Sequence, residues 1–333
     1  MKKASFYKYT LLAATLSLVL PGACDKGPEP PLGHTVITAR IEGAAPQAKT
    51  SYDSDGPYGE FVWSPGDKIA VHYSDGAYVD TISVNPANGE LKAPSTAQRY
   101  RDCYAVYPAA AAVAANYGNP DLQVNLPAGY DISAIVAGTS PLGSAAKDYS
   151  PCPMVAVNDV ATDILDFRHV GGLLRLHLLN IPPATVQVRV RFDSDVTGPF
   201  TVENPGSPEP AVTSSGLTGR NAVLFDLVSD PGGSGGVGTP GTVVLNVPVP
   251  CGTYYSVRAE ALDSQGANLG FVNISYTLKF SRHYGKKFWL LFSRATLGLE
   301  GEGIWWTDRL NEGEDLFWEG NTDLNRGEGI TWK

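Results

Sequence analysis

The sequence is poor in methionine, histidine, cysteine and charge. Its 333 residues include two methionines, five histidines and four cysteines, and 18% of them are charged. The net charge of −9 and a pI near 5.1 provide no basic surface of the kind that nucleic-acid binders need, so we expect no nucleic-acid partner. Ala, Glu, Lys, Leu and Arg do not dominate with a helical period, which excludes a long-helix protein.

The apolar run near the start of the chain is too short to cross a bilayer. Leu11–Leu20 follows a lysine-rich start, and its ten residues are typical of a signal peptide. Small residues then precede Cys24, which resembles a bacterial lipobox although Pro21 stands where leucine is usual. We therefore expect residues 1–23 to be a signal peptide, Cys24 to be lipidated, and residues 24–34 to be a tether at the outer membrane. The alternative is an ordinary cleaved signal with an incidental cysteine.

The other cysteines lack the spacing of a metal site. None of Cys103, Cys152 and Cys251 lies in a C-x-x-C pair or near a histidine at zinc-ligand spacing, so we expect no metal and no other cofactor. A disulfide between Cys103 and Cys152 is one interpretation, because export permits it and both lie in the first half of the chain. The other is that a cysteine is simply a small buried hydrophobic residue.

Glycine (36) and proline (25), in contrast, are abundant and indicate many turns. Between these turns lie short alternating or apolar segments, and Ala109–Ala115 is the one stretch that favours a helix. Asn88-Gly89 is typical of a hairpin turn. This pattern predicts an all-β chain of antiparallel β-sandwiches. We expect one domain over residues 35–160, a second over 161–295 and a separate Trp-rich tail over 296–333.

Several motifs follow one another along the chain: F-x-W-x-x-G-D-x-I-x-V at Phe61–Val71, Y-A-V-Y-P at Tyr104–Pro108, P-M-V-A at Pro153–Ala156, L-D-F-R-H-V-G-G-L-L-R-L at Leu165–Leu176, and a V-P-x-G-T-Y-Y-like element at Val249–Tyr255. Together they resemble the fimbrillin family of Bacteroidota, whose members are type V pilin-like lipoproteins. The resemblance covers residues 35–295 and implies two tandem transthyretin-like β-sandwich domains. It also implies a fimbrial subunit, anchor or accessory adhesin at the cell surface. Because no nucleophile–base pair is visible, we expect no enzymatic activity.

The resemblance further implies a way of assembling. In polymerising members a protease cuts after a basic residue beyond the first strand, and a strand from a neighbouring subunit fills the groove by β-augmentation. Arg40, which ends the segment Thr35–Arg40, is the candidate cut site, and Lys49 is a second one. Arg40 is otherwise an exposed strand residue of an uncleaved anchor or accessory subunit. The expected partners are other fimbrial subunits.

The tail after Ala295 contains three copies of the pattern G-E-x-[I/L]-x-W, and it carries four of the six tryptophans: Trp305, Trp306, Trp318 and Trp332. Three interpretations stay open. The copies are short strands that cover a sheet edge, or they form an intermolecular strand, or their tryptophans are stacking platforms for sugar rings. The third interpretation gives the alternative function, a glycan-binding outer-membrane lipoprotein that contacts glycans or proteins of host or bacterial surfaces.

Overall fold

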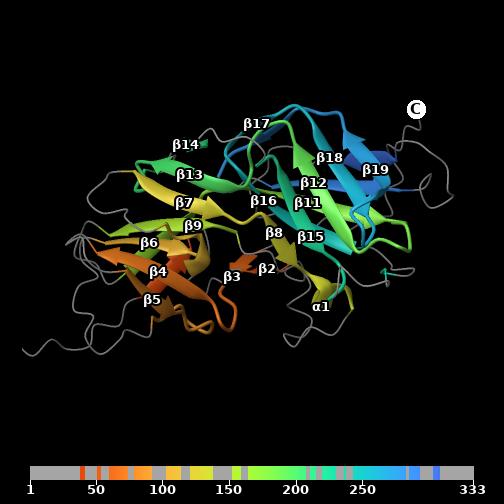
Figure 1. The fold of residues 1–333 in the computed structure, drawn as a ribbon. Helices are drawn as coiled ribbons and strands as arrows, with labels where there is room; N and C mark the ends of the chain where they lie inside the picture. The colour runs from red at the N-terminus through yellow and green to blue at the C-terminus, as the bar shows by residue number, and fades with distance from the viewer. Residues whose placement is uncertain are drawn as a thin grey trace, which may run out of the picture. The chain divides into compact units, whose positions relative to one another are not determined.

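The computed structural model describes residues 38–41, 51–53, 60–73, 79–91, 103–113, 121–137, 152–158, 164–207, 211–214, 220–229, 236–237, 243–282, 285–292 and 303–307. These residues are mostly strands, so the all-β prediction is confirmed (Figure 1). The described helical segments are a 3-10 turn, η1 (Ala109–Ala111), within the stretch expected to be helical, and one α-helical turn, α1 (Ser133–Val136). No helix among the described residues is long and apolar enough to span a membrane.

A six-stranded sheet carries one hydrophobic cluster. Its strands, in spatial order, are β1 (Thr38–Ile41), β10 (Ile164–His169), β9 (Met154–Asn158), β6 (Cys103–Tyr107), β4 (Lys68–Tyr73) and β5 (Val79–Ser83). Ile69 and Val71 alternate into this cluster along β4, as their spacing predicts. Trp63 and Phe167 also belong to it, which places residues of two sequence motifs in one core.

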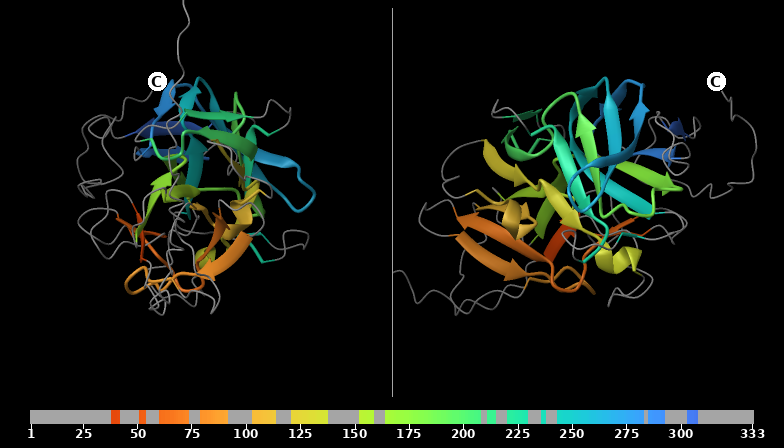
Figure 2. Two further views of the ribbon diagram at one scale, coloured as in Figure 1. Left: turned by 90° about the vertical axis from the view of Figure 1, so that its left-hand side faces the viewer. Right: turned by 45° about the vertical axis from the view of Figure 1, so that its right-hand side comes forward.

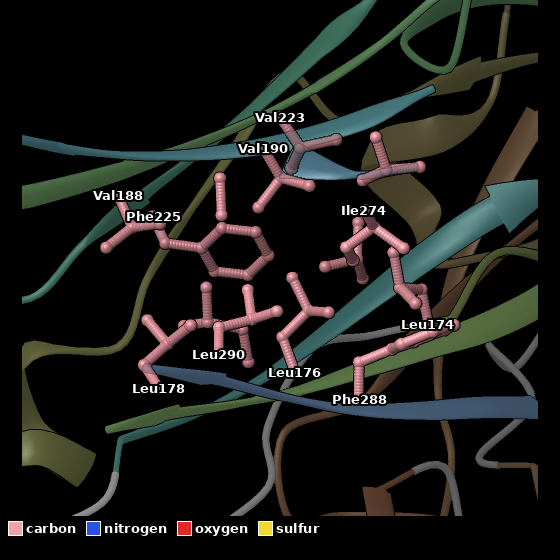
Figure 3. Close-up of a cluster of buried hydrophobic side chains, with 14 of the residues drawn as sticks. Leu174, Leu176, Leu178, Val188, Val190, Val223, Phe225, Ile274, Phe288 and Leu290 are labelled. Carbon is pink, nitrogen blue, oxygen red and sulfur yellow. The ribbon is translucent and has the colours of Figure 1, made fainter. Parts of the chain in front are cut away.

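A four-stranded and a five-stranded sheet enclose the second hydrophobic cluster. One has four strands in the order β16 (Val243–Pro250), β11 (Gly171–Leu179), β21 (Gly285–Leu291) and β22 (Ile304–Thr307). The other has five, in the order β19 (Asn268–Ile274), β18 (Val257–Leu262), β12 (Gln187–Phe192), β15 (Ala222–Asp226) and β8 (Gly129–Asp131). Figure 3 shows leucines of β11 facing valines of β12 and β15 across this core. The packing is that of a β-sandwich.

Three smaller sheets complete the described residues. One joins β14 (Ala211–Ser214), β13 (Gly198–Glu203) and β7 (Leu122–Leu126). The other two are antiparallel pairs, of β17 (Gly252–Tyr254) with β20 (Leu278–Phe280) and of β2 (Ser51–Asp53) with β3 (Glu60–Val62). The side chains of β7 and β13 contribute to a third hydrophobic cluster.

Most of the described strand pairs are antiparallel, as expected, but three are parallel. β1 pairs with β10, β11 with β21, and β15 with β8, all in parallel. Alternation along a strand reports which face is buried, and it carries no information on the direction of the partner. The views in Figure 2 show the blue C-terminal strands beside green strands that are far from them in sequence.

Strand pairs also join the two sides of the domain boundary expected at residue 160. β1 pairs with β10, β7 with β13, and β8 with β15. The two main hydrophobic clusters nevertheless draw most of their residues from 39–173 and 174–292 respectively. The division into two tandem domains stays a prediction.

Candidate functional site

The first described strand, β1, has backbone partners along both of its edges. We call the place that it occupies, between β10 and Gly89, the slot. One edge pairs in parallel with β10, where Arg40 is the register partner of Asp166. On the other edge, the Ala39 amide donates a 2.8 Å hydrogen bond to the Gly89 carbonyl. Ala39 and Ile41 are 2% and 1% exposed, while Arg40 between them is exposed. Burial therefore alternates along β1, and the strand is inserted between two partners.

Trp63 supports β1 from within the core. Its indole nitrogen donates a 3.0 Å hydrogen bond to the Ala39 carbonyl. Its ring makes edge contacts with Tyr107 and Phe167, at centroid distances of 5.4 and 5.5 Å. Three of the sequence motifs therefore meet at one buried tryptophan beside β1. The sequence located the motifs, but their convergence depends on pairings between distant strands.

The turn after Trp63 is tight, as Pro65-Gly66-Asp67 predicts. Gly66 has a φ of +93°, a conformation that glycine adopts without strain. The buried Asp67 carboxylate accepts a 2.5 Å hydrogen bond from the Ser64 amide and a 2.9 Å bond from the Tyr107 hydroxyl. These bonds connect the turn after Trp63 to β6.

Gly89 provides the other wall of the slot. Its φ is +71°, and a Cβ atom at this position would lie 2.4 Å from the Ala39 carbonyl oxygen. That separation is shorter than any real contact of a Cβ atom, and the neighbouring atom belongs to the backbone. A glycine is therefore required here for β1 to approach, in addition to the hairpin turn that Asn88-Gly89 predicts.

Arg40 points away from the core. Its Nε and Nη2 atoms donate to the two carboxylate oxygens of Asp166 at 2.5 and 2.8 Å, and this hydrogen bonding raises the pKa of Arg40. The two side chains are 49% and 41% exposed, so water screens the pair and its contribution to stability is small. Cleavage at Arg40 stays a prediction, and Lys49 lies outside the described residues.

The predicted disulfide between Cys103 and Cys152 is not formed in the structure, which gives both as buried thiols. The β6–β9 register pairs Cys103 with Asn158 and Tyr107 with Met154, so Cys152 lies beyond the opposite end of the pairing. At about 3.3 Å per residue the two cysteines are separated by most of a strand length, whereas a disulfide needs Cα atoms within about 7 Å. Burial raises the pKa of the Cys152 thiol to about 12.

The first copy of the tail repeat forms a strand. Trp305 and Trp306 lie in β22, where they are the register partners of Leu290 and Trp289 on β21. For this copy the interpretation as a short strand at a sheet edge is confirmed. Cys24, Trp318 and Trp332 lie outside the described residues, so lipidation and the sugar-platform interpretation stay predictions.

His177 and Trp289 form a second aromatic group, on neighbouring strands β11 and β21. Their rings stack at 5.1 Å with an interplanar angle of 20°, and the Lys287 ammonium lies 5.8 Å from the Trp289 ring centroid. Burial, together with the positive charges of Arg175 and Lys287, lowers the pKa of His177 to about 3. The imidazole is therefore neutral at physiological pH, which fits a packing role.

A charge cluster around Glu260 was not found from the sequence. Its carboxylate, on a side chain 7% exposed, lies 2.6 Å from Arg189, 2.9 Å from Arg258 and 3.8 Å from Arg191. Arg258 also lies 3.9 Å above the centroid of the Phe271 ring. The alternation of β12 correctly predicts that Arg189 and Arg191 share a face. Nothing in the local sequence predicts the glutamate that compensates their charge.

The described residues offer little room for a small molecule in the hollow beside β11. Its volume of about 10 Å³ accommodates about one water molecule, and it is lined by residues of several strands: Leu126, Cys152, Pro153, His169, Val170, Gly171, Gly172, Pro248, Val249 and Pro250. In the part of the chain that the structure describes, no three His, Cys, Asp or Glu side chains are grouped so that they could hold a metal ion.

Comparison with known proteins gives distant structural likenesses. No protein-family model and no curated protein matches the chain. A candidate cell adhesion protein from Bacteroides ovatus is similar at 12% identity and a TM-score of 0.44, over 82% of this chain and 95% of that one. Another from Bacteroides uniformis has 14% identity and a TM-score of 0.40, over 82% and 98%.

Proposed function

We propose that the chain is a cell-surface, lipid-anchored protein that acts as a pilin-like subunit, anchor or accessory adhesin and assembles by β-strand complementation. The observation that carries the proposal is the slot around β1. A strand of four residues there makes backbone contacts on both edges and buries alternate side chains in the core. This is the arrangement that β-augmentation uses, because main-chain hydrogen bonds give affinity and alternate side chains fill pockets.

The slot would be apolar and incomplete without β1. Ala39 and Ile41 belong to the same cluster as Trp63, Leu165 and Phe167, so removing the strand exposes aromatic and aliphatic surface. It also leaves the Trp63 indole and the Gly89 carbonyl without their partners in β1. Unsatisfied polar groups and exposed apolar surface together favour the entry of another strand. An incoming strand needs a small or aliphatic residue at alternate positions.

The geometry of β1 distinguishes the two candidate cut sites. Cleavage after Arg40 would remove Ala39 from the slot and leave Ile41 attached to the rest of the chain. Cleavage after Lys49 would release both buried residues, and Lys49 is the first basic residue after β1. The N-terminal residue of the processed protein, Ile41 or Thr50, therefore reports which cut opens the slot.

The test is the state of the native protein on the cell surface. We expect SDS-resistant polymers on unheated gels, and mass spectrometry should find an N-terminus at Ile41 or Thr50. Substituting both Arg40→Gln and Lys49→Gln should abolish the polymers. Arg101→Gln, which leaves both candidate cut sites in place, is the control. A monomer with an intact lipidated Cys24 would exclude the processed subunit and leave the uncleaved anchor or accessory adhesin.

A further inference from the structure

The first tail repeat lies where the two sheets of the second core approach each other. β22 pairs antiparallel with β21, the neighbouring strand of the four-stranded sheet. At its start, the Gly303 amide donates a 2.8 Å hydrogen bond to the carbonyl of Phe271 on β19, the edge strand of the five-stranded sheet. The repeat therefore bridges the two sheets. We name the place between β19 and β21 that receives Gly303 the notch.

The notch accepts only glycine at this position. A Cβ atom on Gly303 would lie 2.5 Å from the Leu291 carbonyl oxygen and 2.5 Å from a methyl group of Val272. It would also approach the Phe271 carbonyl oxygen at 3.3 Å. Two of these three atoms belong to the backbones of β21 and β19, which cannot move aside without breaking strand pairing. The side chain of any other residue would prevent this strand from docking.

The three repeats differ at this residue. The first reads Gly301-Glu302-Gly303-Ile304-Trp305-Trp306, and the third reads Gly327-Glu328-Gly329-Ile330-Thr331-Trp332. The middle repeat, Gly313-Glu314-Asp315-Leu316-Phe317-Trp318, has Asp315 at the corresponding position. The third repeat thus matches the first at five of six residues and keeps the required glycine, whereas the middle one does not.

We propose that the notch and the edge of β21 form a second strand-exchange site, whose alternative occupant is the Gly327–Trp332 segment of another copy of this chain. The middle repeat is excluded by Asp315 and serves as a spacer. The site differs from the slot around β1, and its use does not require cleavage at Arg40 or Lys49. The proposal therefore goes beyond the function proposed above and can fail separately from it.

Chain connectivity explains why the occupant would come from another molecule. Ten residues, 293–302, connect β21 with Gly303, whereas thirty-six, 293–328, separate it from Gly329. Because closing a loop becomes less favourable as about the 3/2 power of its length, the first repeat has a roughly sevenfold advantage within its own chain. The third repeat is left as a spare strand. Nineteen residues between Thr307 and Gly327, at up to about 3.3 Å each, allow it to reach a neighbour.

Self-association of the full mature chain tests the proposal directly. Every protein in this experiment carries Arg40→Gln and Lys49→Gln, so that neither candidate site is cut and β1 stays in place. Strand exchange at the slot around β1 is then inactive. Analytical ultracentrifugation should show concentration-dependent dimers or larger species. Gly329→Asp should weaken association at least about tenfold, the equivalent of about 1.4 kcal/mol. Gly313→Asp, the matched glycine-to-aspartate change in the middle repeat, should leave it unchanged. A monomer at all concentrations, or equal association of the Gly329→Asp variant, would overturn the proposal.

Peptide binding provides a second measurement that does not depend on exchange between whole molecules. The receptor is the same chain with Gly303→Asp and Gly329→Asp, which bars both of its own repeats from the notch. A labelled peptide of residues 325–333 should bind, as measured by fluorescence anisotropy. The same peptide with Gly329→Asp, and a peptide of residues 311–319 from the middle repeat, should bind at least about tenfold more weakly. Equal binding of the three peptides would show that the notch does not select glycine, and the proposal would be wrong.

Discussion

The indole nitrogen of Trp63 donates a 3.0 Å hydrogen bond to the carbonyl oxygen of Ala39, across 24 residues of sequence. Both residues are 2% exposed, so the bond lies within the core. When a buried polar group loses its hydrogen-bond partner, the folded state loses more free energy than when an exposed group does, because water cannot replace the bond. The pair therefore couples the stability of the core to the presence of β1.

Trp63→Phe should loosen β1. The substitution keeps an aromatic ring beside Tyr107 and Phe167 but leaves the Ala39 carbonyl without its donor, at a cost of about 1–3 kcal/mol in the free energy of unfolding. Urea denaturation measures this loss, and trypsin should cleave after Arg40 faster than in the wild type. Tyr107→Phe, which removes only the hydroxyl bond to Asp67, is the control: it should also destabilise the protein but leave cleavage after Arg40 slow. Equal cleavage of both variants would contradict this role of Trp63.

Gly89→Ala and Gly66→Ala form a matched pair. Both glycines have positive φ, so each substitution introduces backbone strain of about 1 kcal/mol or more. A methyl group at Gly66 meets nothing within 4 Å, whereas one at Gly89 meets the Ala39 carbonyl at 2.4 Å. We expect the Gly89 variant to lose more unfolding free energy and to expose β1 to trypsin. If the two variants behave alike in both measurements, the close approach of Gly89 to Ala39 does not hold β1 in place.

His177 should make the protein less stable in weak acid. In the unfolded chain its pKa is near 6.5, and in the folded protein it is about 3, so below pH 6.5 the unfolded chain binds a proton that the folded protein does not. Stability is thus lost as the pH falls from 6.5 towards 3. His177→Phe keeps a ring beside Trp289 and removes the titration. Relative to this variant, the wild type should lose about 2 kcal/mol between pH 7 and pH 5, measured by urea denaturation. Parallel pH profiles would refute the assignment.

The cysteines should differ in their reaction with iodoacetamide at pH 8. The thiolate is the reactive form, and burial raises the pKa of Cys152 to about 12, so this residue should remain unmodified in the folded protein. Cys251 is only partly buried and should react first. Peptide mass mapping before and after denaturation measures the order. Rapid labelling of Cys152 in the native protein, or its recovery in a disulfide with Cys103, would contradict the structure.

The sequence predicts local features well and long-range ones poorly. The alternation of β4, the turn at Gly66 and the exposed face of β12 follow from patterns within a few residues. The parallel pairing of β1 with β10 and the register that separates Cys103 from Cys152 do not, because each depends on which distant strand becomes the neighbour. The alternation of buried and exposed residues along a strand does not indicate whether its neighbour runs parallel or antiparallel to it.

The candidate site shows the same limit. The family resemblance points to Arg40 and the repeats point to the tryptophans of the tail. The sequence places Trp63 only in a motif and Gly89 only in a hairpin turn, and neither pattern shows that they form the slot. Their contacts with Ala39 arise from tertiary approach of the backbones. Gly303 is similar: its sequence position is unremarkable, and only the distances to Leu291 and Val272 explain why no side chain is tolerated.

The pairing of β1 with β10 also sets an order of folding. Arg40 and its partner Asp166 are 126 residues apart, so β1 is synthesised long before the strand that receives it exists. Until β10 is made, β1 lacks its parallel partner, and contacts of such separation form slowly. We expect β1 to be the last strand of its sheet to enter and the first to leave. The strand complementation proposed above would use this interval, because the place of β1 is then vacant.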